Sequence, residues 1–288
     1  MTDTPVVKPK FKGVGVRLVS AVGLLLLCMA PFYFGGWLWA FLAGLFGGRM
    51  LFEWVRMSDP APALPAYIAP ILGLVAGIIY VVQGNVGLAI VALSVTASAV
   101  AIIQIMQQGQ IADEEDDKIN RVGWAVLGVV YIIIPVLLIV GMRGNEVGFD
   151  TIGFQRLLFI LVCVIAADVG AYFGGSTFGG PKLAPKLSPN KTWSGFVAGQ
   201  VAAITLGALV GTFVGIGWLT GALLALPIAI LSVLGDLFES GIKRKLHVKD
   251  TGGLMPGHGG LLDRLDSLMA AVIGAAILLA LFPTVWPG

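Results

Sequence analysis

Long apolar runs follow one another along most of the chain, with short polar segments between them, and no other feature restricts the fold as strongly. About 20 apolar residues in a helix are enough to cross the hydrocarbon core of a bilayer. Because 57% of the residues are apolar and only 12% are charged, a water-soluble fold would lack the polar surface to cover itself. The sequence therefore predicts an all-α polytopic membrane protein with about nine transmembrane helices. The expected spans are residues 17–34, 36–55, 67–83, 86–107, 122–142, 156–175, 193–214, 217–238 and 268–286.

Lys and Arg are distributed unevenly between the two sides of this predicted bundle. Short loops that carry Lys and Arg stay on the cytoplasmic side of a membrane. If the N-terminus is cytoplasmic, only Arg143 and Arg156 of the 18 basic residues fall on the far side. We therefore expect a cytoplasmic N-terminus, a C-terminus on the opposite side, and the charged loops on the cytoplasmic face.

Side chains that bind soft metals are scarce. Cys28 and Cys163 both lie within apolar runs, which is typical of packed thiols and not of a disulfide or a metal pair. Two His are too few for a His-based metal site. Any metal should therefore be held by carboxylates, a set of ligands that suits Mg²⁺ or Mn²⁺.

Five consecutive acidic residues, 113–117, stand between the fourth and fifth expected spans. A metal-binding role is conceivable for such a run. Like charges in a short loop are more often a solvated face or a flexible segment, and we favour that interpretation.

A second polar region begins inside the sixth expected span with Asp168. About 10 Å of helix separates Asp168 from the cytoplasmic end of the span, and an ionisable group at that depth is a functional candidate. Tyr172 follows one turn later on the same face. The next loop contains Ser188, Asn190 and Lys191, and the last two adjoin a helix start, where free N–H groups favour an anion. We favour binding of a phosphate or head group; the alternative is a loop whose Lys residues only contact anionic lipids.

The densest group of ionisable residues lies between Asp236 and Ser267. Asp236, Glu239 and Lys243 fall at i, i+3 and i+7, so a helix presents all three on one stripe as it leaves the membrane. A carboxylate pair beside basic residues suits a divalent ion and the phosphates that the ion bridges.

Glycines dominate the segment that follows, residues 251–260, and let backbone N–H groups approach a nucleotide. Asp263 and Asp266 then stand one turn apart at the start of the last span, while Arg264 points elsewhere. The alternative is an interfacial loop whose charges pair among themselves. We favour binding, because acidic residues flank the loop on both helices.

The fixed positions of this region are Ser240-x-Ile242-Lys243-Arg244, Lys249-Asp250, Pro256-Gly257-His258-Gly259-Gly260 and Asp263-Arg264-x-Asp266. They resemble the signature of the phosphatidate cytidylyltransferases, also called CDP-diacylglycerol synthases. Residues 168–172 and 188–193 also resemble family elements, so the resemblance covers roughly residues 160–288. Two positions depart from the family pattern: Ser194 stands where Glu is common, and Met255 where a branched apolar residue or Phe is more usual.

The resemblance implies transfer of CMP from CTP to phosphatidic acid, giving CDP-diacylglycerol and pyrophosphate in phospholipid biosynthesis. It implies that Asp236 and Asp263 hold Mg²⁺ or Mn²⁺, with a second cation left open. The catalytic residues that we expect are Asp236, Lys243, His258, Asp263 and Arg264. The substrate-binding residues that we expect are Asp168, Ser188, Asn190, Lys191, Glu239, Arg244, Lys249, Asp250 and Asp266.

We expect residues 1–155, with about five spans, to form a scaffold, and residues 156–288, with about four spans, to form the catalytic region. The predicted partners are CTP, phosphatidic acid and the lipid bilayer, with no nucleic acid, and homo-oligomer formation is left open. The predicted location is a bacterial inner membrane with the active site facing the cytoplasm.

Two other functions are alternatives. A CTP-dependent kinase of a lipid alcohol would also need Mg²⁺, CTP and a membrane site, but it transfers the γ-phosphoryl group and releases no pyrophosphate. An ion-coupled transporter would use Asp168 and Asp236 as intramembrane ligands and would turn over no CTP. The sequence contains no inverted repeat that would favour a transporter.

Overall fold

The computed structural model describes residues 28–59, 61–108, 115–248, 250–252 and 259–286. Within these residues, eight helices are long and apolar enough to cross a membrane, which confirms the all-α polytopic prediction. The first expected span lies largely outside the described residues, although residues 28–34 are helical. The eight helices are α2 (Gly36–Ser58), α3 (Leu64–Val82), α4 (Val86–Gln108), α5 (Glu115–Arg143), α6 (Ile152–Phe178), α7 (Trp193–Phe213), α8 (Trp218–Lys245) and α9 (Leu262–Leu281).

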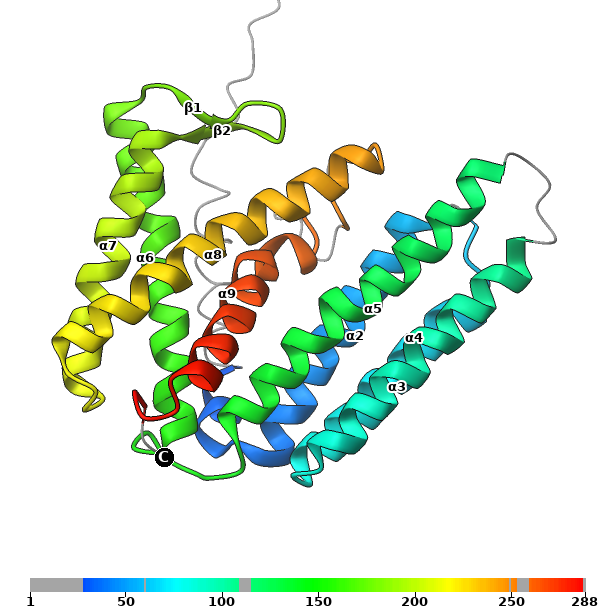
Figure 1. The fold of residues 1–288 in the computed structure, drawn as a ribbon, viewed down its shortest axis with the longest axis horizontal. Coiled ribbons are helices and arrows are strands. Elements are labelled where there is room, and N and C mark those ends of the chain that lie inside the picture. The colour runs from blue at the N-terminus through cyan, green and yellow to red at the C-terminus, as the bar shows by residue number, and fades with distance from the viewer. Residues whose placement is uncertain (1–27, 60, 109–114, 249, 253–258, 287–288) are drawn as a thin grey trace, which may run out of the picture.

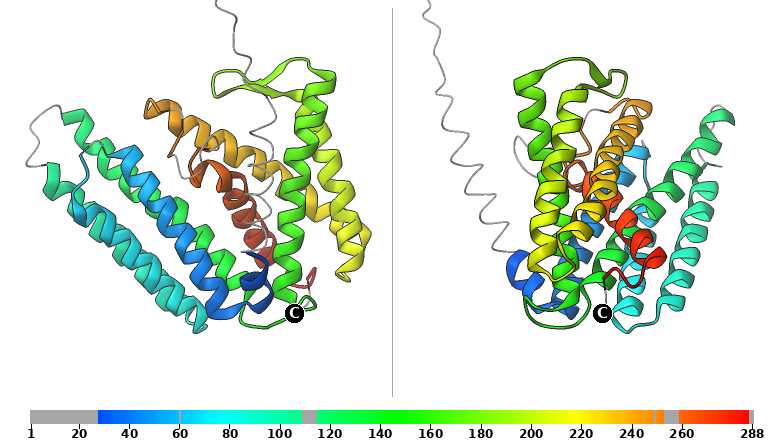
Figure 2. Two further views of the ribbon diagram at one scale, coloured as in Figure 1. Left: turned by 180° about the vertical axis from the view of Figure 1, so that it is seen from behind. Right: turned by 60° about the vertical axis from the view of Figure 1, so that its left-hand side comes forward.

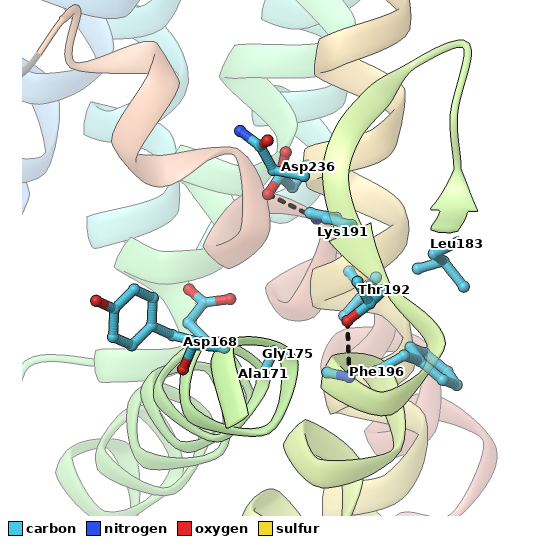
Figure 3. Close-up of a pocket in the computed structure, with 13 residues that line it drawn as sticks. Asp168, Ala171, Gly175, Leu183, Lys191, Thr192, Phe196 and Asp236 are labelled. Carbon is cyan, nitrogen blue, oxygen red and sulfur yellow. Dashed lines mark hydrogen bonds and ion pairs between the residues drawn. The ribbon is translucent and has the colours of Figure 1, made fainter. Parts of the chain in front are cut away.

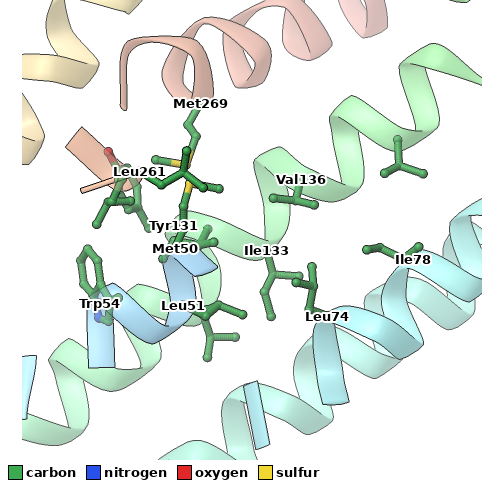
Figure 4. Packing of buried hydrophobic residues seen from close by; sticks show 14 of the residues in the cluster. Met50, Leu51, Trp54, Leu74, Ile78, Tyr131, Ile133, Val136, Leu261 and Met269 are labelled. Atoms are coloured by element: carbon green, nitrogen blue, oxygen red, sulfur yellow. The ribbon is translucent and has the colours of Figure 1, made fainter. Parts of the chain in front are cut away.

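Helices α2 to α5 lie side by side and form one part of the molecule (Figure 1). Met50, Leu51 and Trp54 of α2 are buried in a cluster with apolar side chains of α3 and α5 (Figure 4). The Trp54 indole donates a hydrogen bond to the carbonyl of Trp124 on α5, 2.9 Å away. A side chain at Gly128 would collide with the Trp54 ring, so α5 passes this ring closely because residue 128 is glycine.

The same apolar cluster continues into the second half of the chain. It includes Ile242 of α8 and Leu262 and Met269 of α9, all buried. The two halves therefore share a core, which fixes the end of α2 against the start of α9. The functional division into residues 1–155 and 156–288 stays a prediction.

Helices α6 and α7 pack closely because glycines line their contact. A Cβ atom on Gly199 of α7 would lie 2.6 Å from the Ala167 carbonyl oxygen of α6. A Cβ atom on Gly170 of α6 would lie 2.7 Å from Ala202 Cβ of α7. Small residues at such positions allow helix backbones to approach in a membrane, where van der Waals packing holds helices together.

A hairpin joins α6 to α7, where the sequence predicted only a loop. Strands β1 (Lys182–Ala184) and β2 (Ser188–Thr192) pair antiparallel and project beyond the helix ends (Figure 1). The strands are short, and their sequences Lys-Leu-Ala and Ser-Pro-Asn-Lys-Thr do not alternate between apolar and polar side chains. The sequence pattern therefore could not reveal them. Both views of Figure 2 place the hairpin at the end of the molecule opposite the marked C-terminus.

The helices that flank the predicted binding loop extend beyond the expected spans 217–238 and 268–286, and they confirm that residues 236–243 and 263–266 are helical. Helix α8 continues to Lys245, and α9 already begins at Leu262. The charged side chains between residues 236 and 245 and the aspartates at 263 and 266 are therefore held on helices. In the acidic run, residues 113 and 114 lie outside the described part of the chain, and residues 115–117 begin α5.

Candidate active site

A pocket of about 540 Å³ opens between α6, α7, α8 and the hairpin. Its polar lining comes from segments that are far apart in the sequence: Asp168 from α6, Asn190 and Lys191 from β2, and Asp236 from α8. Apolar side chains such as Phe196 complete the wall. Four residues that the sequence predicts to bind substrate or metal therefore meet in one pocket.

Lys191 and Asp236 form an ion pair inside this pocket, with 2.6 Å between Lys191 Nζ and Asp236 Oδ2. The two side chains are 25% and 35% exposed, so a ligand can reach them. One turn further along α8, the Ser240 hydroxyl donates to Asp236 Oδ1 at 3.3 Å. Figure 3 shows Asp168 on the α6 side of the pocket and the ion pair on the other side. A cation and two carboxylates in one cavity can bind a phosphate together with a divalent ion.

The start of α7 fixes the position of Lys191. Strand β2 runs directly into α7, and Thr192 caps the helix because its Oγ1 accepts a hydrogen bond from the Gly195 N–H at 3.1 Å. The Ser194 hydroxyl donates to the carbonyl of Gly179, the last residue of the α6 cap. Ser194 thus ties the start of α7 to the end of α6. The helix N-terminus adds a partial positive charge beside Lys191.

Asp263 binds the two ends of the glycine-rich loop, residues 251–252 and 259–260. We call these four residues the loop base. Its Oδ2 accepts hydrogen bonds from the Thr251 N–H and hydroxyl, both at 3.0 Å, and from the Gly260 N–H at 2.9 Å. Its Oδ1 accepts one from Lys243 Nζ at 2.7 Å. The Asp263 carboxylate therefore joins both ends of the loop to α8.

Glu239 and Asp266 are buried carboxylates beside this loop base, with exposed fractions of 0% and 6%. Glu239 Oε2 lies 3.6 Å from Lys243 Nζ, and Asp266 accepts the Ser267 N–H at 2.7 Å. Among the described residues, neither oxygen of Glu239 has a hydrogen-bond donor, while Glu239 and Asp266 interact electrostatically. Because buried carboxylates are costly when unpaired, this pair suits a bound cation or a shared proton.

The oxygens available in this site are of the kind that the predicted divalent ion binds. Asp236 is partly exposed, and the oxygens of Glu239 accept no hydrogen bond from the described residues, whereas Asp263 accepts four. Within the described ranges, no three Asp, Glu, His or Cys side chains are grouped closely enough to hold an ion by themselves. Mg²⁺ usually takes one or two carboxylates and completes its shell with water and substrate phosphates, so a larger group of carboxylates is not needed here.

Of the other predicted residues, the structure describes Ser188, Arg244, Asp250 and Arg264. Ser188 is half-buried at the start of β2. Arg244, Asp250 and Arg264 are exposed. Outside the described residues lie Lys249 and His258.

Glu53 of α2 belongs to the site but was not predicted from the sequence. It is 1% exposed and accepts hydrogen bonds from the N–H groups of Leu261 and Leu262 at 3.1 and 2.9 Å. A signal was present, because Glu53 lies inside an apolar span, and an ionisable residue there is a functional candidate by the same argument that selected Asp168.

Comparison with known proteins agrees with the resemblance and extends it. A family model described as the cytidylyltransferase family matches residues 15–282, well beyond the region 160–288 in which the sequence showed motifs. The phosphatidate cytidylyltransferase of Brucella melitensis biotype 1 is 34% identical over 272 residues, which cover 94% of this chain and 93% of that protein. The phosphatidate cytidylyltransferase of Helicobacter pylori (strain J99) is 33% identical over 277 residues, covering 94% and 91%. That of Haemophilus influenzae is 48% identical over 126 residues, covering 42% and 44%.

Proposed function

The chain belongs to the cytidylyltransferase family, and we propose that the pocket between α6, α7 and α8, together with the loop base at Asp263, is its active site. The reaction is transfer of CMP from CTP to phosphatidic acid, which gives CDP-diacylglycerol and pyrophosphate. The observation that carries this conclusion is the match to a phosphatidate cytidylyltransferase over 94% of the chain. The protein is thus a nucleotidyltransferase of phospholipid biosynthesis.

The active site faces the cytoplasm of a bacterial inner membrane. Two observations support this orientation. Only Arg143 and Arg156 of the 18 Lys and Arg residues fall on the far side when the N-terminus is cytoplasmic. The hairpin, the end of α8 and the start of α9 lie together at one end of the molecule, opposite the C-terminus (Figure 1). Nucleotides are available on the cytoplasmic face, as this reaction requires.

The chemistry needs little acid–base assistance. An ionised phosphate oxygen of phosphatidic acid attacks the α-phosphorus of CTP, a new P–O bond forms, and the bond to the β-phosphate breaks with release of pyrophosphate. Because the nucleophile is already charged, catalysis consists mainly of positioning two anionic substrates and neutralising their charge. The basic side chains of the site and the N-terminus of α7 beside Lys191 meet that need.

The pocket side of the site binds the head group of phosphatidic acid. Lys191 supplies a cation, and Asn190 and Ser188 supply hydrogen-bonding groups on the same strand. Phe196 and other apolar residues of α6 to α8 line the pocket, so acyl chains can remain in lipid while the phosphate reaches Lys191. Asp168, on the opposite wall, contacts the nucleotide or head group from its side.

The loop side of the site binds the triphosphate of CTP. Lys243 is held between Glu239 and Asp263 and points toward the loop base. Arg244, Lys249 and Arg264 are the further phosphate ligands, and Asp250 borders the same loop. Asp266 either orients Arg264 or joins the metal ligands, and His258 positions a phosphate or moves a proton.

Mg²⁺ or Mn²⁺ would be held by Asp236 and by Asp263, whose Oδ1 would exchange its Lys243 contact for the ion, with the buried oxygens of Glu239 and Asp266 nearby. When bound, a divalent ion neutralises the triphosphate and the departing pyrophosphate. Lys191 and Lys243 pair with Asp236 and Asp263 and so compensate the charge of these carboxylates.

The test uses purified protein, phosphatidic acid, Mg²⁺ and CTP labelled separately at the α- and γ-phosphates. The α-label is expected in the lipid product and the γ-label in pyrophosphate. A γ-label in the lipid would establish the kinase alternative. Failure to consume CTP, with the protein folded, would favour the transporter. Asp236→Asn is the matched inactive control, because it replaces one oxygen of the pocket carboxylate and keeps its size.

A further inference from the structure

We propose that Glu53, on α2 in the first half of the chain, is a positioning residue for this reaction. Its carboxylate holds the N-terminus of α9 and the base of the glycine-rich loop in the arrangement that binds substrate. This gives the first half of the chain, predicted only as a scaffold, a direct part in building the active site.

The contacts of Glu53 are those of a helix cap supplied by a distant segment. Helix α9 has no side-chain cap of its own at Leu261. The first N–H groups of a helix have no partner within the helix and carry a partial positive charge. Glu53 Oε1 accepts the Leu261 N–H at 3.1 Å, and Oε2 accepts the Leu262 N–H at 2.9 Å. A carboxylate that lies about 200 residues away in the sequence therefore does what a cap residue normally does.

The loop base is shaped around the Glu53 carboxylate. A Cβ atom on Gly252 would lie 2.9 Å from Glu53 Oε1, and one on Gly260 would lie 2.7 Å from Oε2. The Thr251 hydroxyl, which donates to Asp263, is also 3.5 Å from Glu53 Oε2. Both ends of the loop thus pass directly over Glu53, and glycine at two positions makes this approach possible.

Arg49 completes the arrangement from the same helix. Its Nε donates to Glu53 Oε1 at 3.0 Å, one turn before Glu53 on α2. Arg49 is 30% exposed at its side chain, whereas Glu53 is buried, so the arginine faces outward and the carboxylate inward. The charge of Glu53 is therefore compensated without any group of the loop having to neutralise it.

Glu53 acts on catalysis through Asp263. The first turn of α9 carries Asp263, whose contacts with Lys243, Thr251 and Gly260 define the loop base. If the N-terminus of α9 shifts, Asp263 and the loop shift with it. This consequence rests on the proposed assignment of the triphosphate to the loop, and it predicts weaker binding of CTP and not of phosphatidic acid.

The competing explanation is that Glu53 only joins the two halves of the protein. Glu53→Gln tests the positioning role against this explanation. Glutamine has the same size, but its NH₂ group replaces one of the two oxygens that accept the Leu261 and Leu262 N–H groups. The matched control is Asp59→Asn, at the end of the same helix. Asp59 is also buried and accepts hydrogen bonds from Ala61 N and Gln104 Nε2, but its contacts lie outside the loop base.

The experiment measures hydrogen–deuterium exchange of the 250–262 segment, steady-state kinetics and thermal unfolding of the full chain in detergent. For Glu53→Gln we expect amide exchange in this segment to accelerate and KM for CTP to rise about 10-fold, a loss of about 1.4 kcal/mol. KM for phosphatidic acid should change less than about twofold, and Asp59→Asn should change neither KM. If Glu53→Gln fails to fold, Glu53→Asp, which keeps the charge on a shorter side chain, should show a smaller rise in KM for CTP.

Unchanged exchange in residues 250–262, or accelerated exchange with unchanged kcat and KM per folded enzyme, would overturn the proposal. A rise in KM for phosphatidic acid in place of CTP, with accelerated exchange, would retain the positioning role of Glu53 and refute the assignment of the triphosphate to the loop. The two failures are therefore distinguishable.

Discussion

Replacing Asp263 by Asn tests the loop base at its most connected side chain. Asparagine keeps one oxygen, which can still accept the Thr251 and Gly260 N–H groups, but its NH₂ group then faces Lys243 Nζ, the partner of Oδ1 at 2.7 Å. Lys243 would retain only Glu239 at 3.6 Å. The substitution therefore removes an ion pair and places the asparagine NH₂ group against the Lys243 ammonium group, both of which are donors, without changing the side-chain volume.

The expected loss of stability follows from the burial of Asp263 and Lys243. The side chains of Asp263 and Lys243 are 11% and 16% exposed, so solvent screens their ion pair only in part. Breaking a buried pair by removing one charge costs about 3 kcal/mol. We expect Asp263→Asn to lower the free energy of unfolding by about 2 to 3 kcal/mol and to reduce CDP-diacylglycerol synthesis at least about 100-fold. The protein should still insert and purify.

A double-mutant cycle with Lys243→Gln isolates the pair. Unfolding of the four proteins in detergent should give a coupling energy of about 2 kcal/mol. Asp150→Asn, which changes an exposed carboxylate between α5 and α6, should alter neither stability nor activity. A coupling below about 0.5 kcal/mol would show that the Lys243 contact does not hold the loop base. Substantial synthesis by Asp263→Asn would refute its role in the reaction.

Three further predictions concern the pocket, the helix packing and the topology. Lys191→Met should raise KM for phosphatidic acid at least about 10-fold, whereas Lys186→Met, on the exposed turn of the same hairpin, should change it less than about twofold; equal effects would show general attraction to anionic lipid. Gly199→Ala should lower the unfolding temperature, because its Cβ would lie 2.6 Å from the Ala167 carbonyl, whereas Gly48→Ala, with open space around it, should not; equal unfolding temperatures would refute this packing. A reporter that is active only in the periplasm should work at Gly288 and fail at Lys186, and the reverse pattern would invert the topology.

The sequence predicts the helical spans well because each span is a long apolar run, and a bilayer demands such runs. The apolar pattern alone stops at the membrane boundary, and the spacing of Asp236, Glu239 and Lys243 is what indicates that charged residues continue the helix beyond it. Helix α8 extends to Lys245 because residues 239–245 include good helix formers whose polarity ended the apolar pattern. The β1–β2 hairpin escaped prediction since its few residues show no alternation of apolar and polar side chains.

The candidate site could also be predicted only in part from the sequence. The carboxylates and basic residues of the second half could be found because they stand close together in the sequence and match a family signature. Glu53 could not be placed this way, because its partners Leu261 and Leu262 are apolar residues that act only through their backbone N–H groups. The position of Glu53 in an apolar span marks it as a candidate, but a backbone contact leaves no trace in residue type, so only the folded arrangement identifies its partners.

Close packing and charge are connected at one point in α8. Gly235 immediately precedes Asp236, and a Cβ atom at this glycine would lie 2.7 Å from the Asp266 carbonyl oxygen of α9. Helix α9 can therefore pack against α8 close to the carboxyl groups of Glu239 and Asp266. This approach brings Asp266 next to Glu239, and the two buried carboxyl groups lie close enough to share a proton. Close helix packing at a glycine thus brings two carboxyl groups together, which is the condition for a site that binds cations and polyphosphates.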